Sequence, residues 1–72
     1  MHLRFETASR YYVARLDRDL FGTWLVRVAH GGKFSNLGKI ITQPVHSERE
    51  GIQRMAAIAV RRVKRKYVQK SG

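Results

Sequence analysis

Residues 19–32 read DLFGTWLVRVAHGG, a stretch that predicts a tight turn followed by a strand. Asp19 can open the turn by bonding to its own backbone, and Gly22 tolerates the positive φ that a tight hairpin requires. The side chains then alternate between two faces, and we expect a central strand over residues 23–31. Its core face should carry Trp24, Val26 and Val28.

Shorter alternating patterns predict three further strands around this one. They cover residues 2–6, 10–19 and 37–45. The strand over residues 10–19 precedes the turn, so it should pair antiparallel with the central strand. Its parity gives a core face of Tyr12, Ala14 and Leu16.

Ser47 begins the predicted helix, which we expect over residues 48–67. Its hydroxyl can accept a hydrogen bond from the Glu50 amide while the Glu50 side chain reaches back, which is the capping-box arrangement. Apolar residues follow at steps of three or four and predict one stripe against the sheet. The stripe consists of Ile52, Met55, Ala56, Ala59, Val63 and Tyr67. We therefore expect a single α+β domain over residues 1–72, with a small antiparallel sheet of three to four strands packed by one C-terminal helix.

The charge of the chain is strongly positive and unevenly distributed. Fifteen Lys and Arg residues against five Asp and Glu residues give a formal net charge of +10, and no acid follows Glu50. A cationic surface of this kind attracts polyanions, of which nucleic acid is the commonest in a cytoplasm. The sequence therefore favours a nucleic-acid-binding module. The alternative is a protein-interaction module whose basic surface docks an acidic partner.

Other classes of protein are not expected from this composition. The chain has no cysteine, which suits a reducing cytoplasm, and no apolar run approaches the roughly 20 residues that cross a bilayer. We therefore expect a cytoplasmic protein without a membrane partner. The acids are scattered and His2, His30 and His46 lie far apart, so neither a general acid–base pair nor a local metal motif is evident. We expect no enzymatic activity, no metal and no cofactor.

Several pieces of the sequence carry a resemblance to a known family. They are RYY at residues 10–12, DLFGTW at 19–24, LVR at 25–27, the glycine-containing segment 31–39 and RKY at 65–67. Together they resemble a WGR domain, from about Leu3 to Tyr67. The resemblance implies an antiparallel sheet packed by one helix, and a role in binding duplex DNA or its ends, as WGR domains do in some poly-ADP-ribose polymerases. His30, Gly31 and Gly32 stand at the position of Trp-Gly-Arg, so the resemblance supports the fold more than end recognition.

We predict nine residues as contacts to nucleic acid, preferably DNA. Five crowd the end of the helix, where dipole compensation alone does not explain their density, and four lie near the glycine segment. The nine are Arg27, His30, Lys33, Lys39, Arg61, Arg62, Lys64, Arg65 and Lys66.

The five cations at the helix end cannot all face one groove, because helical residues are about 100° apart. Arg61, Lys64 and Arg65 should share one side, and Arg62 and Lys66 an adjacent side. We expect the side nearer the glycine pair at residues 31–32 to dominate. His30 could stack on a base or donate to a phosphate there.

Overall fold

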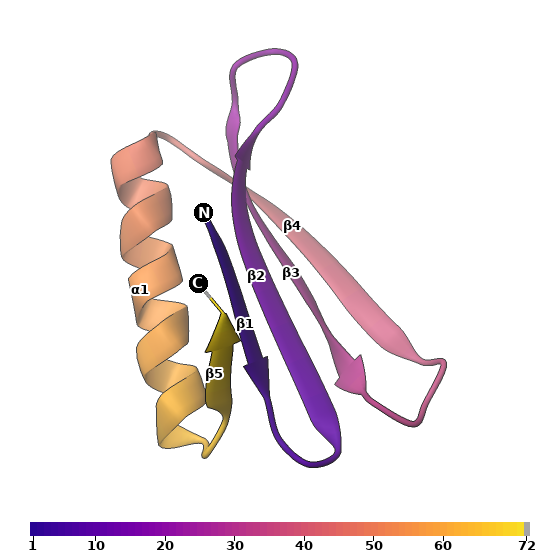
Figure 1. Ribbon diagram of the computed structural model, residues 1–72. Helices are drawn as coiled ribbons and strands as arrows, with labels where there is room; N and C mark the ends of the chain where they lie inside the picture. Colours follow the sequence, from indigo (N-terminus) through magenta and orange to yellow (C-terminus); the bar gives the residue numbers. More distant parts are fainter. Residues whose placement is uncertain (72) are drawn as a thin grey trace.

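The computed structural model describes residues 1–71, and Gly72, the last residue of the predicted domain, lies outside them. The elements follow the order β1 (His2–Glu6), β2 (Arg10–Arg18), β3 (Trp24–Gly32), β4 (Gly38–Val45), α1 (Glu48–Lys64) and β5 (Val68–Ser71). The strands form one antiparallel sheet, and α1 lies across one of its faces (Figure 1). The α+β fold predicted from the sequence is confirmed.

The sheet has the strand order β4-β3-β2-β1-β5, so β4 and β5 are its edges. The predicted pairing of β2 with β3 is confirmed, with Ala14 opposite Val28 and Leu16 opposite Val26. The strand β5 was not predicted. It pairs antiparallel with β1, so the first and last strands of the chain lie side by side.

The prediction that the helix continues to residue 67 is wrong, because α1 ends at Lys64. Lys66 has a left-handed backbone with φ of 65°. The amide of Lys66 donates to the Val63 carbonyl and the amide of Tyr67 to the Arg62 carbonyl, each at 3.0 Å. These two bonds are those of a Schellman motif, which satisfies the last helical carbonyls and turns the chain back. Residues 65–67, which were expected in the helix, therefore form the turn that leads into β5.

The turn between β2 and β3 is built as predicted. The Asp19 carboxylate accepts hydrogen bonds from the amides of Phe21 at 2.9 Å and Thr23 at 2.8 Å, and Gly22 has φ of 82°. Because the loop satisfies its own backbone, it needs no packing from elsewhere. Leu20 and Phe21 stand at its tip, 100% and 93% exposed.

The core lies between α1 and the sheet. The largest fully buried side chains are Phe5 of β1 and Met55 of α1. The buried hydrophobic residues in the described part of the chain are Leu3, Phe5, Ala14, Leu16, Val26, Val28, Val45 and Met55. The predicted core parity of β2 and β3 is therefore confirmed, although Tyr12 and Trp24 are only partly buried at the margin of this cluster.

The predicted apolar stripe of the helix is wrong in part. Met55 is buried and Ala59 packs on the core, but Ile52 and Val63 are 45% and 58% exposed. The face that meets the sheet runs through Gly51, Met55 and Ile58 instead. The Ala56 side chain is also exposed. The helix is rotated so that Gly51 faces the sheet, because only a residue without a side chain fits where the helix comes closest to Leu16.

Candidate nucleic-acid interface

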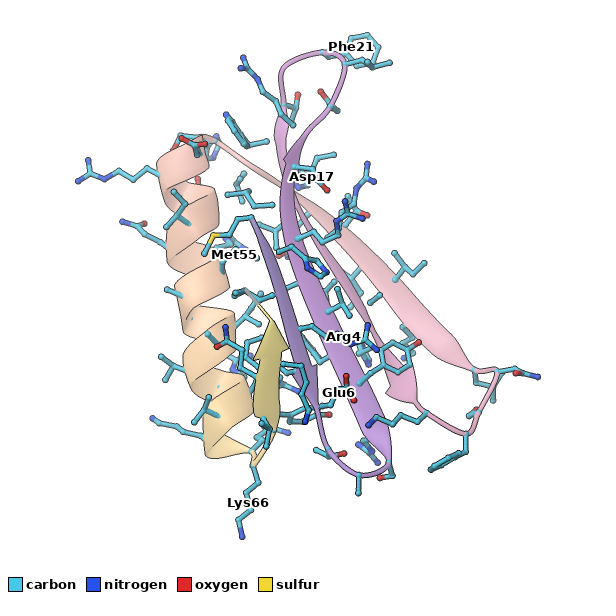
Figure 2. All side chains as sticks on the ribbon, in the orientation of Figure 1. Arg4, Glu6, Asp17, Phe21, Met55 and Lys66 are labelled. Atoms are coloured by element: carbon cyan, nitrogen blue, oxygen red, sulfur yellow. The ribbon has the colours of Figure 1, made fainter. Side chains whose placement is uncertain are left out.

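The positive charge of the molecule is concentrated at one end, because arginines balance the acids at the other, where Arg15 pairs with Asp17 and Arg54 with Glu50. Asp17 lies near the hairpin tip, at the end where α1 begins, and Lys66 lies at the far end (Figure 2). Asp19 caps the hairpin, and Glu48 and Glu50 occupy the first turn of α1. Cations occupy the last turn of the same helix. We call the end that contains the last turn of α1 and the turn between β1 and β2 the cationic end.

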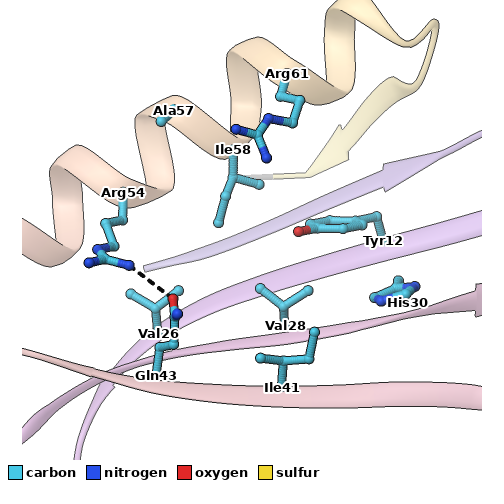
Figure 3. Close-up of a pocket in the computed structure, with 10 residues that line it drawn as sticks. All are labelled: Tyr12, Val26, Val28, His30, Ile41, Gln43, Arg54, Ala57, Ile58 and Arg61. Atoms are coloured by element: carbon cyan, nitrogen blue, oxygen red, sulfur yellow. Dashed lines mark hydrogen bonds between the residues drawn. The ribbon is translucent and has the colours of Figure 1, made fainter.

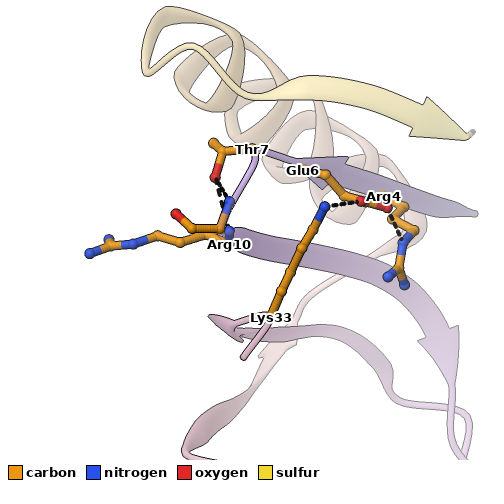
Figure 4. A network of polar contacts seen from close by, with 6 residues as sticks. Arg4, Glu6, Thr7, Arg10 and Lys33 are labelled. Atoms are coloured by element: carbon orange, nitrogen blue, oxygen red, sulfur yellow. Dashed lines mark hydrogen bonds and ion pairs between the residues drawn. The ribbon is translucent and has the colours of Figure 1, made fainter. Parts of the chain in front are cut away.

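Glu6 is the one carboxylate of the described residues near the cationic end, and two cations neutralise it. Its Oε1 lies 2.6 Å from the Lys33 Nζ and its Oε2 lies 2.9 Å from the Arg4 Nε (Figure 4). The Glu6 side chain is only 19% exposed. The hydrogen bond from Lys33, followed by that from Arg4, lowers the pKa of Glu6 from 4.5 to about 2. The carboxylate therefore stays charged and engaged at neutral pH.

The five predicted cations of the helix end point in different directions. Arg61 lines a groove beside β3 and β4, whereas Arg62 turns inward over the sheet. Lys64 is exposed, and Arg65 caps the helix. The prediction that Arg62 and Lys66 share one side is wrong, because Lys66 lies beyond the end of α1.

The groove beside Arg61 lies between α1 and the part of the sheet that the helix leaves uncovered (Figure 3). Its volume is about 400 Å³. Apolar side chains form its floor, and two arginines come from its helical wall. Arg54 is held in place, since its guanidinium donates to Gln43 at 2.9 Å and pairs with Glu50 at 3.5 Å. The lining residues are Tyr12, Val26, Val28, His30, Ile41, Gln43, Arg54, Ala57, Ile58 and Arg61.

His30 lies at one end of this groove and stacks on Tyr12. The two ring centroids are 5.7 Å apart and the ring planes differ by 15°. His30 belongs to β3, and its partner across the ladder on β4 is Lys39. The structure therefore brings His30, Lys39 and Arg61 to the same side of the sheet as the helix.

The remaining two predicted contacts, Arg27 and Lys33, lie on different parts of the molecule. Arg27 alternates with the buried Val26 and Val28, so it stands on the face of the sheet away from α1. Lys33 is bound to Glu6. Lys33 also lines a depression with Lys66 and Lys70, and its amide donates to the Ser9 carbonyl in the turn between β1 and β2. The structure therefore separates Arg27 from the helix end, whereas Lys33 lies at the cationic end with its ammonium bound to Glu6.

Arg10 belongs to the cationic end and was not predicted. It begins β2 and lines a surface depression together with Arg62 and Arg65. The turn before it fixes its backbone, because the Thr7 hydroxyl accepts the Arg10 amide at 2.9 Å (Figure 4). The sequence carried a signal for this site only in the threonine and serine that precede the arginine.

Within residues 1–71, no three histidine or acidic side chains come together as a metal ion would require. None of the helices in that range has the length and apolar character needed to cross a membrane. Comparisons with models of protein families, with curated proteins and with solved structures find no match. The geometry and charge of this chain are therefore the basis on which its function is proposed.

Proposed function

We propose that this protein binds nucleic acid through its cationic end. The observation that carries the proposal is the excess of cations at this end, because Asp17 and Glu50 at the other end are paired with arginines there and Glu6 is neutralised by two cations. The side chains that would contact phosphates are Arg10, Lys39, Arg61, Arg62, Lys64, Arg65 and Lys66. Contacts of this kind are independent of sequence and depend on salt.

The groove between α1 and β4 is a second part of this proposed interface. Its floor is apolar, and the stacked rings of Tyr12 and His30 close one end. Phosphates on the rim at Arg61 would place a base or sugar over this floor, where an aromatic or histidine ring can stack. Duplex DNA or its ends is the ligand favoured by the resemblance to WGR domains. A binding module in the cytoplasm, rather than an enzyme, is part of the proposal.

The second candidate function is a protein-interaction module that docks an acidic partner. The observation that favours it is the apolar floor of the groove, where Ile41 is 48% exposed and the buried Val28 lies beneath it in the lining. A protein segment with apolar and acidic side chains would match that lining. A titration with nucleic acid separates the two candidates, because phosphate contacts release condensed counterions and give a linear log–log dependence on salt, whereas screening weakens any contact between opposite charges.

The test is a binding titration with duplex, nicked and single-stranded DNA and with RNA at several salt concentrations. We expect log Kobs to fall linearly with log salt, with a slope of about −0.9 for each neutralised phosphate on duplex DNA. Replacing Arg61 and Arg65 by Gln should reduce that slope by about two units. Replacing Arg27 and Arg49 by Gln removes the same charge outside the cationic end and should change the slope less.

Two results would overturn the proposal. One is a complex insensitive to salt in all four ligands. The other is an equal change in slope from the two double variants, since affinity would then follow net charge and not the cationic end. Either result would favour the acidic protein partner.

A further inference from the structure

Arg62 differs from every other arginine in residues 1–71, because it alone is not exposed. Its guanidinium carbon lies 4.3 Å from the ring centroid of Tyr12 and 5.2 Å from that of Tyr67. The two rings are themselves in edge contact, with centroids 6.4 Å apart. Residues from β2, the end of α1 and the start of the return to β5 therefore hold this cation in one position.

No acceptor accompanies this burial. The Arg62 Nε is inaccessible to solvent and has no hydrogen-bond partner among the described residues. Aromatic rings stabilise the faces of a guanidinium, but its N–H groups point outward in its plane and need oxygen acceptors. A donor removed from water without a partner is unfavourable, so the site is incomplete as far as the described residues go.

The depression that Arg62 lines supplies the room and the charge for an anion beside the guanidinium. It has a volume of about 450 Å³. Three arginines and three hydroxyl side chains line it, and none of its lining residues is acidic. The lining residues are Thr7, Ser9, Arg10, Arg62, Arg65 and Tyr67, which we call the Arg62 pocket.

The side of the pocket opposite the helix is a defined turn. The Thr7 hydroxyl accepts hydrogen bonds from the amides of Ser9 at 3.3 Å and Arg10 at 2.9 Å. The Thr7 amide donates a hydrogen bond to the Arg10 carbonyl at 2.9 Å. Arg10 therefore begins from a fixed backbone. On the other side, the Schellman bonds of the helix end fix Arg65 and Tyr67.

We infer that the Arg62 pocket binds one phosphate group. A planar guanidinium group pairs with two phosphate oxygens through two parallel hydrogen bonds. The pocket has three guanidinium groups, which together carry more charge and more N–H donors than a single carboxylate requires. Arg62 would supply the fixed, half-buried contact, and Arg10 and Arg65 would close on the anion from the surface.

An adjoining depression indicates what is attached to the phosphate. It has a volume of about 230 Å³ and shares Arg10 and Tyr67 with the Arg62 pocket. His30 and the glycine pair at residues 31–32 complete its lining. Glycines leave room for close approach, and the rings of His30 and Tyr67 can contact a sugar or a base. We therefore assign the phosphate group to a nucleotide unit. This assignment rests on the proposed function, whereas the binding of a phosphate group in the Arg62 pocket does not.

The inference is tested by adding inorganic phosphate to the ¹⁵N-labelled protein at constant ionic strength, with chloride as the reference anion. We expect saturable shifts of the Arg62 Nε–H signal and of the amides of Thr7, Ser9 and Arg10. Adding a nucleoside monophosphate should extend these shifts to the amides of Gly31 and Gly32. Shifts scattered over the surface, or equal for phosphate and chloride, would overturn the inference.

Variants separate a built site from general charge attraction. Arg65→Gln should weaken phosphate binding by about tenfold because it removes a charge-assisted contact, while Lys64→Gln removes the same charge from the neighbouring exposed position and should have little effect. Arg62→Lys keeps the charge but loses the planar fork, so it should abolish the saturable response. If Arg62→Lys is unfolded by circular dichroism, Arg10→Gln and Arg65→Gln decide the question, since both residues are exposed. Equal effects of Arg65→Gln and Lys64→Gln would contradict the site.

The same measurements distinguish this inference from the proposed function. Phosphate shifts at the Arg62 pocket without salt-dependent nucleic-acid binding would support the site and contradict the function. Salt-dependent nucleic-acid binding that Arg62→Lys leaves unchanged, without phosphate shifts, would support the function and contradict the site.

Discussion

Gly51 of α1 lies directly against Leu16 of β2, so closely that a Cβ at Gly51 would overlap the Leu16 Cδ1. This contact sets both the distance between the helix and the sheet and the rotation of the helix about its axis. Glycine lowers helix stability by about 1 kcal/mol relative to alanine, so its place inside α1 needs a reason of this kind. The rotation it permits puts Met55 into the core and leaves Ile52 at the surface.

Gly51→Ala should therefore destabilise the protein in spite of its better helix propensity. The gain of about 1 kcal/mol is opposed by overpacking against the Leu16 side chain, which typically costs 1–3 kcal/mol, and Leu16 is itself buried in the core and has little room to move. Urea unfolding measures the net loss. Gln53→Ala, at an exposed position of the same helix, should be neutral or slightly stabilising. A Gly51→Ala protein as stable as the wild type would show that the helix can move away from β2.

Ser47→Ala should lower the free energy of unfolding by about 0.5–2 kcal/mol. The Ser47 hydroxyl accepts a hydrogen bond from the Glu50 amide at 3.1 Å, and the Glu50 carboxylate accepts one from the His46 amide at 2.9 Å. Ser47→Asp preserves an acceptor at the cap and should retain most of the stability. Amide hydrogen exchange of the first turn of α1 provides a local measurement, and unchanged protection in Ser47→Ala would contradict the role of the cap.

Glu6 should make stability depend on pH in acid. Its pKa in the folded protein is about 2, below the value of about 4.3 expected in the unfolded chain, because Lys33 and Arg4 bind the charged form. The folded state therefore binds fewer protons, and the stabilisation is fully present above about pH 4.3 and is lost as the pH falls toward 2. Thermal unfolding of Glu6→Gln should show a lower Tm than the wild type at pH 6 and no difference near pH 2. Glu48→Gln, at an exposed position, serves as the control, and a Glu6→Gln difference independent of pH would contradict this assignment.

Trp24→Ala should cost about 2–3 kcal/mol, less than the 3–5 kcal/mol of a fully buried aromatic. Trp24 packs on the core from a partly buried position, and the Arg18 guanidinium lies 5.6 Å from its ring centroid. Phe34→Ala is the matched control, because Phe34 is 89% exposed and its removal should change stability by less than about 0.5 kcal/mol. Equal effects of the two variants in urea unfolding would contradict the packing of Trp24.

The sequence predicted those parts of the fold that depend on local patterns. Asp19 and Gly22 define their turn through bonds within a few residues, and Ser47 likewise marks its helix start. The end of α1 carried no such signal, because a lysine and not a glycine takes the left-handed position there. The helix rotation depends on the contact of Gly51 with β2, which no helical periodicity reveals.

The candidate site was predicted only as a collection of charges. Alternation along β3 separates Arg27 from His30, and the ammonium of Lys33 is bound by Glu6 within the cationic end. Arg10 meets Arg62 only because the turn after β1 lies beside the end of the helix. Such proximity follows from the tertiary arrangement, which the spacing of basic residues does not contain.

The pairing of β1 with β5 also has a consequence for the order of folding. The hairpins β1–β2, β2–β3 and β3–β4 join strands that follow one another in the chain. Phe5 of β1 pairs instead with Gln69 of β5, and most of the chain, including α1, lies between these two residues in the sequence. Closing so long a loop costs more chain entropy and slows a contact, so the three hairpins form early and β5 docks last. The short edge strand is correspondingly the first to open in the native state, and each opening loosens Tyr67 from the guanidinium of Arg62.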